Sequence, residues 1–260
     1  MIAAYDWGEA GTPALMLHCM LGRAETWTGL MGALQTPLVA RGFDLPGHGR
    51  SSPWDGTEDL HAHCTALAQA ECPPDAVVIG HSFGATLGLR LALEGRRALR
   101  ALVLIEPVLF AAARGSPEAK AQEPHDATLA SAFATGDLAR AARSFLAQWG
   151  VGPSFEALPP DQKARVLARM PMIRATAPVL NDDTAGLLRP GGLEGLDLPV
   201  LLLRGTDSPA VTGAINRALT ARLPRAETDE IAGAGHMAPL THMRETASRI
   251  DRFLAALPTA

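Results

Sequence analysis

Ser82 lies at the centre of the pentapeptide GHSFG, residues 80–84, where its hydroxyl could act as a nucleophile. The pentapeptide follows an apolar run and opens a helical one, which is typical of a sharp strand-to-helix turn, the nucleophile elbow. Only small residues fit beside such a turn, which accounts for Gly80 and Gly84. The turn would lift Ser82 clear of the sheet, at a helix N-terminus whose free N–H groups favour a developing oxyanion.

His236 is the candidate base, because a serine hydroxyl is a weak nucleophile until a base takes its proton. It lies in the Gly-rich segment AGAGHMAPLTHM, after the last predicted strand. A side chain in that loop can reach over the edge of the sheet. His242, six residues further on, is expected at the surface or at the start of the last helix. We therefore predict that His236 serves Ser82.

Alternating strands and helices must hold these two residues in place. Apolar runs predict buried strands over 14–18, 37–44, 76–82, 101–107 and 198–205, and a short strand near 226–232. They lack strict alternation of apolar and polar residues, as parallel strands covered on both faces do. Helices are predicted over 26–34, 57–70, 83–96, 211–223 and 243–257. This order predicts an α/β fold: a mostly parallel central sheet with helices on both faces.

The alternation stops between residues 108 and 196, where no strand is predicted. Segments 129–150 and 159–180 have the pattern of amphipathic helices interrupted by Gly and Pro. A stretch of this length is an insertion and not a loop. We therefore predict a core formed by residues 1–107 and 197–260, with a helical insertion at 108–196.

The chain resembles the α/β-hydrolase superfamily in six segments that occur in the expected order. These are LMLHCMLG, DLPGHGRSS, VVIGHSFGA, LVLIEPV, LLLRGTDSP and GAGHMAPLTH. The resemblance covers nearly the whole chain outside the insertion. It implies strand ends that carry a Ser–acid–His triad and a helical cap, or lid, inserted after the strand that follows the elbow. Within DLPGHGRSS, Asp44, His48 and Ser51 are expected to stabilise a turn beside the site.

Two residues are candidates for the acid of the triad. The superfamily usually has G-x-x-D after a later strand, often followed by proline, but here that spacing puts Ser208 in the slot and Asp207 one residue early. Some branches place the acid at the end of the strand after the elbow, where this chain has Glu106. A buried glutamate needs a partner, and an imidazolium is a suitable one. We favour Glu106 and keep Asp207 as the alternative, either of which would orient His236 through Nδ1.

The oxyanion hole is expected to use two backbone N–H groups. One belongs to Phe83, directly after the nucleophile, and the other to Met20, by its position in the superfamily pattern. The superfamily usually has His-Gly at the positions of His18 and Cys19. Cysteine restricts the backbone more than glycine does. Cys19 is expected to be a small buried residue and not a second nucleophile.

These residues predict hydrolysis of a small-molecule carboxylic ester through an acyl-enzyme, without cofactor or metal. A serine at the elbow argues against the superfamily branches that use aspartate there, which open epoxides or remove halides. Lactone hydrolysis, carbon–carbon bond hydrolysis and cofactor-free perhydrolysis remain alternatives on the same site, and so does a ligand-binding receptor with little turnover. Large apolar residues of the insertion are expected to form its own core, and some could line a substrate pocket: Phe110, Phe133, Phe145, Trp149, Phe155, Met170 and Met172.

Bulk composition adds limits on partners. The formal net charge is −4 and no basic stripe is visible, so nucleic acid is not an expected partner. Three cysteines without disulfide spacing suit a reducing compartment. No signal peptide and no run of eighteen apolar residues is found, so no membrane association is expected and we predict a cytoplasmic protein.

Overall fold

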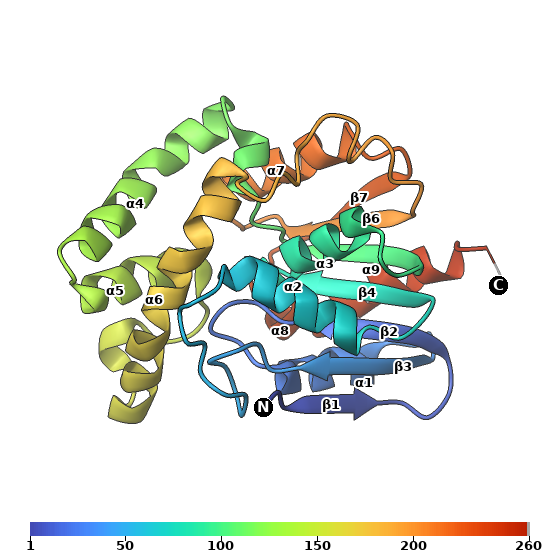
Figure 1. The fold of residues 1–260 in the computed structure, drawn as a ribbon, viewed down its shortest axis with the longest axis horizontal. Coiled ribbons are helices and arrows are strands. Elements are labelled where there is room, and N and C mark those ends of the chain that lie inside the picture. The colour runs from blue at the N-terminus through green and yellow to red at the C-terminus, as the bar shows by residue number, and fades with distance from the viewer. Residues whose placement is uncertain (259–260) are drawn as a thin grey trace.

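The computed structural model describes residues 1–258, and its centre is a seven-stranded sheet (Figure 1). The strand order is β1-β3-β2-β4-β5-β6-β7, and every pair is parallel except β1 with β3. The strands are β1 Ala4–Trp7, β2 Thr12–Leu17, β3 Leu38–Phe43, β4 Ala76–His81, β5 Leu99–Ile105, β6 Val200–Gly205 and β7 Ala226–Ile231. The predicted mostly parallel sheet is therefore confirmed.

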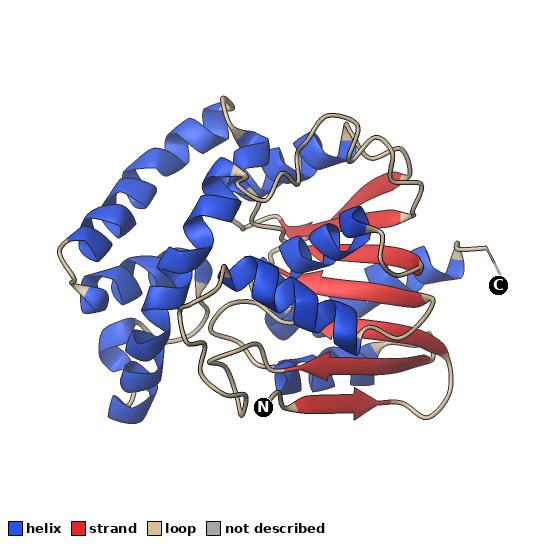
Figure 2. Cartoon of the chain, in the orientation of Figure 1, coloured by secondary structure: helices blue, strands red, loops and turns tan. Residues whose placement is uncertain are grey.

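Helices cover both faces of the sheet (Figure 2). In the buried strands, successive side chains enter two different cores, since side chains alternate between the faces of a strand. One core receives Val78, Leu102 and Leu202 and packs against α2 (Leu60–Glu71), α3 (Phe83–Glu94) and α7 (Ala210–Thr220). The other receives Ile79, Val103 and Leu203 and packs against α1 (Thr28–Ala33) and α9 (Met243–Ala255).

Three long helices lie between β5 and β6 in the chain, although those two strands are neighbours in the sheet. They are α4 (Pro117–Ala134), α5 (Leu138–Trp149) and α6 (Pro160–Asp182), called the inserted helices below. In Figure 1 they stand beyond the carboxyl ends of the parallel strands. This is the edge of an open α/β sheet at which ligands bind.

Some elements differ from those expected from the sequence. The short strand β1 was not predicted; its four residues are half-buried or exposed and carry no apolar run. Helix α4 begins at Pro117, because Ser116 caps it by accepting a hydrogen bond from the Ala119 N–H group. Helix α6 continues through Pro171 and Pro178, so the interruption expected from these prolines is wrong. The pattern failed here because a long helix can keep its other hydrogen bonds around a proline.

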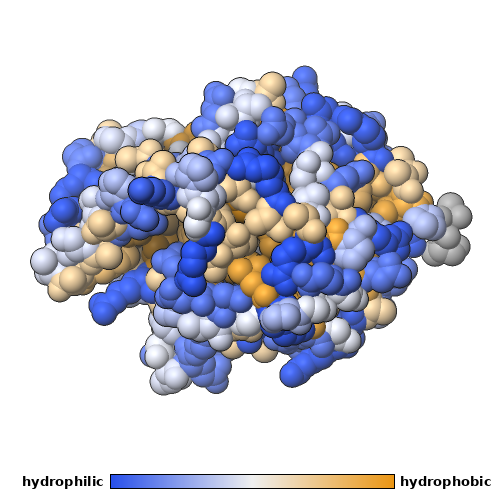
Figure 3. Space-filling model, turned by 90° about the horizontal axis from the view of Figure 1, so that it is seen from above, coloured by the Kyte–Doolittle hydropathy of each residue, from blue (hydrophilic) through white to orange (hydrophobic). Residues whose placement is uncertain are grey.

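The remaining elements are short. They are 3₁₀ turns at Ala24–Trp27, Phe110–Ala113 and Phe155–Ala157 and the helix α8 at Ala238–Thr241. On the face drawn in Figure 3, hydrophilic and hydrophobic residues are interspersed. Among residues 1–258, the structure contains no helix that combines the length and apolar character needed to cross a bilayer.

Candidate active site

Ser82 occupies the turn between β4 and α3 with φ +57° and ψ −117°. Such a conformation costs a non-glycine residue about 1–3 kcal/mol and persists only where the surroundings enforce it. The two flanking glycines explain how the turn fits. A Cβ on Gly80 would lie 2.4 Å from the Gly84 carbonyl oxygen, and one on Gly84 would lie 2.1 Å from that of Leu17. The backbone thus packs too closely for any larger residue, as the sequence predicts.

His236 lies in the loop between β7 and α8, and its ring faces Ser82. The distance from its Nε2 to the Ser82 Oγ is 2.9 Å. Its Nδ1 lies 3.1 Å from Oε2 of Glu106, and the residue is only 6% exposed. A carboxylate can only accept, so Nδ1 carries the proton and Nε2 is free to accept the proton of Ser82. Residues from three separate strand ends therefore form one line of contacts.

Glu106 directly follows β5 and is completely buried. Its φ of +53° is unusual for glutamate. The carboxylate has three partners: Oε1 accepts from the Gly205 N–H group and from the Ser208 hydroxyl, each at 2.6 Å, and Oε2 faces His236. This set of contacts satisfies a charge that would otherwise be costly to bury.

Asp207, the alternative acid, lies elsewhere. Its side chain is exposed, and Oδ1 accepts a hydrogen bond from the Thr206 hydroxyl at 3.1 Å. The described residues show no contact between Asp207 and His236. The next residue, Ser208, is the one that turns inward, with 8% exposure. The one-residue offset noted in the sequence thus places Asp207 outside the site.

The loop after β2 contributes Met20 to the lining of the cavity that contains Ser82. Neither Met20 nor Phe83 donates its amide to any acceptor among residues 1–258, and both residues line the cavity that contains Ser82. The left-handed conformation in this loop falls on Leu21, at φ +63°, and not on Cys19. Cysteine is therefore accommodated where the superfamily usually has glycine. Burial raises the pKa of the Cys19 thiol to about 12, which keeps it protonated.

Two buried histidines shape that loop. His48 accepts the Leu21 N–H group on Nε2 at 3.1 Å, and His18 accepts the Leu45 N–H group on Nε2 at 2.9 Å. Burial lowers the pKa of His18 to about 4 and that of His48 to about 3, so both are neutral at pH 7. The neighbouring Asp44 accepts the Ala24 and Arg50 N–H groups, each at 2.8 Å. These contacts agree with a turn-stabilising role for DLPGHGRSS.

His81 also supports the site, from the position before the serine. Its Nε2 donates to the carbonyl oxygen of His236 at 2.8 Å. Burial and, to a lesser extent, the nearby His236 lower the pKa of His81 to about 3. The neutral ring thus holds the backbone of the loop that carries His236.

A cavity of about 310 Å³ opens over Ser82 between the core and the inserted helices. Four of the large apolar residues singled out in the insertion line it, namely Phe110, Phe133, Phe145 and Trp149. The other three, Phe155, Met170 and Met172, are not among its lining residues and are buried in the core. The Trp149 ring meets that of His236 edge-on, with 4.8 Å between centroids. The inserted helices therefore contact the candidate base directly.

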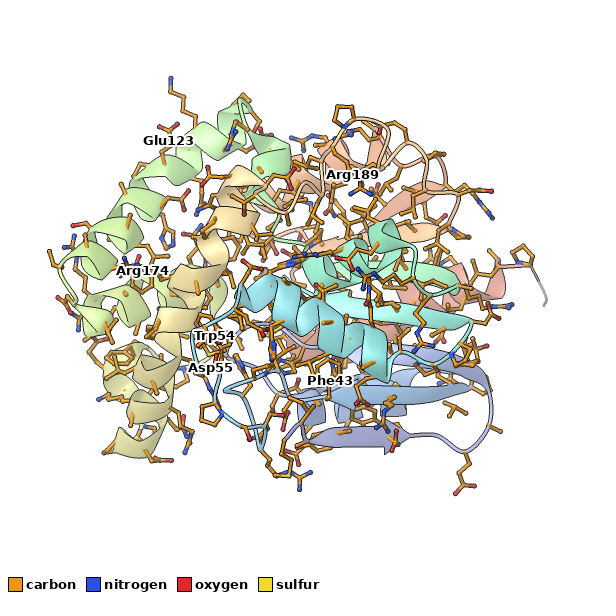
Figure 4. All side chains as sticks on the ribbon, in the orientation of Figure 1. Phe43, Trp54, Asp55, Glu123, Arg174 and Arg189 are labelled. Carbon is orange, nitrogen blue, oxygen red and sulfur yellow. The ribbon has the colours of Figure 1, made fainter. Side chains whose placement is uncertain are left out.

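The cavity also has a polar side. His125 and Asp126 from α4 and Arg174 and Asn181 from α6 belong to its lining. Figure 4 shows Arg174 between α6 and α4. Burial lowers the pKa of His125. The hydrophobic periodicity of the sequence could not distinguish these residues from ordinary surface residues of a helix, because they differ only in facing the cavity.

Comparison with known proteins adds to this geometry. The model of a family described as "Alpha/beta hydrolase family" matches residues 14–249. A pimeloyl-[acyl-carrier protein] methyl ester esterase of Xanthomonas campestris pv. campestris is 31% identical over 249 residues, covering 88% of this chain and 92% of that protein. The enzyme of the same description from Serratia marcescens is 27% identical over 259 residues, covering 96% of each chain.

Solved structures share the fold. An alpha/beta hydrolase enzyme, MGS-M2, from a Medee basin deep-sea metagenome library superposes with a TM-score of 0.73 at 18% identity, covering 100% of this chain and 96% of that chain. The carboxylesterase CesB from Bacillus subtilis superposes with a TM-score of 0.68 at 20% identity, covering 97% of this chain and 87% of that chain. At these identities the likeness concerns the arrangement of the sheet and helices.

Proposed function

The chain belongs to the alpha/beta hydrolase family, and from this premise we propose that it is a serine hydrolase that cleaves small-molecule carboxylic esters. The observation that carries the proposal is the line of contacts from Ser82 through His236 to Glu106. A hydroxyl, an imidazole and a carboxylate in this order are the three parts of a nucleophilic triad. Relatives named as methyl ester esterases support the same reaction class.

In the first half of the reaction, Ser82 Oγ attacks the ester carbonyl carbon while its proton moves to Nε2 of His236. The resulting imidazolium gives this proton to the departing alkoxide, which leaves as an alcohol. In the second half, water attacks the acyl-enzyme and passes a proton to His236, which returns it to Ser82 as the carboxylic acid leaves. The atoms balance as one ester plus one water giving one acid and one alcohol.

Glu106 is the proposed acid of this triad. Its contact with Nδ1 fixes the tautomer that leaves Nε2 free to accept, and its charge stabilises the imidazolium. Asp207 has no part in this proposal, because its exposed carboxylate bonds to Thr206.

The amides of Met20 and Phe83 are the proposed oxyanion hole. Neither amide donates a hydrogen bond to another described residue, and both residues line the cavity beside Ser82. A donor that waits for the oxyanion needs no reorganisation during the reaction, and removal of one such donor costs about 10²- to 10³-fold in turnover in serine proteases.

The inserted helices act in this proposal as a cap that encloses the acyl or alcohol part of the substrate. Support comes from the four aromatic residues that they and the adjoining 3₁₀ turn place in the cavity. An apolar lining with a few polar groups suits an ester with an aliphatic or aromatic body. The relatives are named for the methyl ester of pimeloyl-[acyl-carrier protein], whose pimeloyl part is an aliphatic chain.

A fluorophosphonate probe together with a panel of p-nitrophenyl esters tests the proposal. We expect covalent labelling of Ser82, mapped by mass spectrometry, and turnover on at least part of the panel. Ser82→Ala is the control and should lose both. Absence of labelling and of turnover on every ester would favour the receptor-like alternative and refute the enzyme proposal.

A further inference from the structure

A second polar cluster lies behind the nucleophile, between α2 and α3. It consists of His61 on α2 with Thr86 and Arg90 on α3. His61 and Thr86 are completely buried, and neither lines the cavity. The Nε2 atom of His61 lies 3.1 Å from the Thr86 Oγ1, and its Nδ1 lies 3.2 Å from NH1 of Arg90. The proposed reaction does not use these groups, so the contacts of His61 with Thr86 and Arg90 need another explanation.

The hydrogen bonds of this cluster all run in one direction. A guanidinium can only donate, so Nδ1 of His61 must accept from Arg90. In a neutral imidazole the proton then lies on Nε2, which donates to the Thr86 Oγ1. The Thr86 hydroxyl is left to donate onward, and its partner is the carbonyl oxygen of Phe83 at 2.7 Å.

His61 stays neutral, which preserves this direction. Burial and, to a lesser extent, the nearby positive charge of Arg90 lower its pKa to about 3. Arg90 itself is held in place by Glu94, whose Oε1 lies 2.8 Å from its Nε, and Asp59 lies 3.9 Å from NH1.

The chain of hydrogen bonds from Arg90 ends at Phe83, whose backbone N–H group is a proposed oxyanion donor. Phe83 is held at its carbonyl by Thr86 and at its ring by His61, which meets it edge-on with 5.4 Å between centroids. The Phe83 ring is only 1% exposed. Both contacts restrict the first turn of α3, where the Phe83 amide must point toward the substrate.

We propose that Arg90, His61 and Thr86 are positioning residues, whose directional chain of hydrogen bonds fixes the Phe83 amide in the oxyanion hole. This inference rests on the proposed function. Without the guanidinium, the His61 proton could move to Nδ1. Nε2 would then accept from Thr86, and the Thr86 hydroxyl would no longer reach Phe83.

Two matched pairs of variants test the chain. Arg90→Met removes the donor to His61, whereas Glu94→Gln removes only the charge of the ion pair and keeps a side-chain oxygen that can accept from the Arg90 Nε–H group, so the donor to His61 stays in place. Thr86→Val removes the hydroxyl with little change of shape, whereas Thr86→Ser keeps it. For a p-nitrophenyl ester turned over by the wild type, we expect kcat to fall about tenfold in Arg90→Met and Thr86→Val, a part of the loss caused by deleting an oxyanion donor. KM should change less than twofold, and Glu94→Gln and Thr86→Ser should stay near wild type.

Nitrogen-15 NMR of the histidine side chains gives a readout that does not depend on activity. The wild type should show His61 protonated on Nε2, and Arg90→Met should show protonation on Nδ1 or a mixture. If the wild type already has the proton on Nδ1, or if Arg90→Met leaves the tautomer unchanged, the chain is refuted. Equal kcat in Thr86→Val, Thr86→Ser and wild type would refute it as well.

The two proposals fail in different ways. If the proposed function is wrong, the wild-type protein will hydrolyse no ester, while the His61 tautomer will still change in Arg90→Met. If the positioning role is wrong, the wild type will be active and kcat will be the same in both pairs of variants. If Arg90→Met does not fold, the Thr86 pair carries the test alone.

Discussion

Ser208 donates its hydroxyl to Oε1 of Glu106 at 2.6 Å, across the ends of two neighbouring strands. Ser208 occupies the position in which the superfamily pattern places its usual acid, and here it donates to a carboxylate that follows the neighbouring strand β5. The Gly205 amide, from the same loop, donates to the same oxygen at 2.6 Å. The loop after β6 thus supplies two donors where an acid was expected.

The identity of the acid can be tested directly. Glu106→Gln should lower kcat by about 10³- to 10⁴-fold, because an amide in place of the carboxylate no longer stabilises the productive tautomer and charge of His236. Asp207→Asn should leave kcat near wild type, since the exposed Asp207 bonds only to Thr206 among the described side chains. Steady-state kinetics on one p-nitrophenyl ester suffices, and the reverse order of the two variants would refute the assignment.

Ser208→Ala removes one donor from the buried Glu106 carboxylate. A hydrogen bond to a charged group contributes about 1.5–3 kcal/mol, so the free energy of unfolding should fall by that amount. We also expect kcat to fall about tenfold, roughly the equivalent of 1.4 kcal/mol in the transition state. Urea unfolding and kinetics measure the two effects. Ser154→Ala, which deletes an exposed serine hydroxyl that makes no side-chain cap hydrogen bond, is the control and should change neither.

Cavity length should set the preferred chain length of the ester. Each CH₂ that enters an apolar cavity contributes about 0.8 kcal/mol, so kcat/KM should rise about fourfold per added carbon until the cavity is full. Ala177 of α6 lines the cavity, and Ala177→Phe should move the optimum to shorter acyl chains. Ala164→Phe, on the exposed side of the same helix, should leave the profile unchanged. An identical profile in all three proteins would place the acyl chain outside this cavity.

Stability should fall in mild acid because of four buried histidines. Burial lowers the pKa values of His18, His48, His61 and His81 to about 3–4, against about 6.5 in the unfolded chain. Between these values the unfolded chain binds more protons, so the free energy of unfolding decreases as the pH falls from about 6.5 to about 4. Each histidine contributes up to about 1.4 kcal/mol per pH unit.

Urea unfolding at a series of pH values measures this slope. His61→Gln should make it shallower by one proton, whereas His63→Gln, at a less buried position of the same helix, serves as the matched control. A free energy of unfolding that is constant across this range would contradict the buried neutral state of these rings.

The sequence predicted the elements that depend on local pattern. The turn at Ser82 follows from a strand, two glycines and a helix that are contiguous in the chain, and the mostly parallel sheet follows from the order of apolar runs. The expected superfamily is confirmed by the family match over residues 14–249. The core and insertion boundaries at 108 and 196 stay a prediction, as do the site residues.

The choice between Glu106 and Asp207 could not be made from the pattern, because it depends on backbone angles. Glu106 turns its side chain toward His236 with a φ of +53°, a conformation that no propensity assigns to glutamate. Asp207 is turned away by its place in the β6–α7 loop, where its N–H group bonds to the carbonyl oxygen of Ala234. The supporting contacts of His48 and His81 join segments far apart in the chain, beyond the reach of local periodicity.

Glu106 is the last residue before the chain leaves the sheet for the inserted helices. Its N–H group donates to the Leu203 carbonyl oxygen at 2.8 Å, and its carboxylate has partners on two other loops. Because these contacts end at Glu106, the backbone from Pro107 onward is the first part of the insertion that they do not fix. Glu106 is thus the anchor between the sheet and the inserted segment.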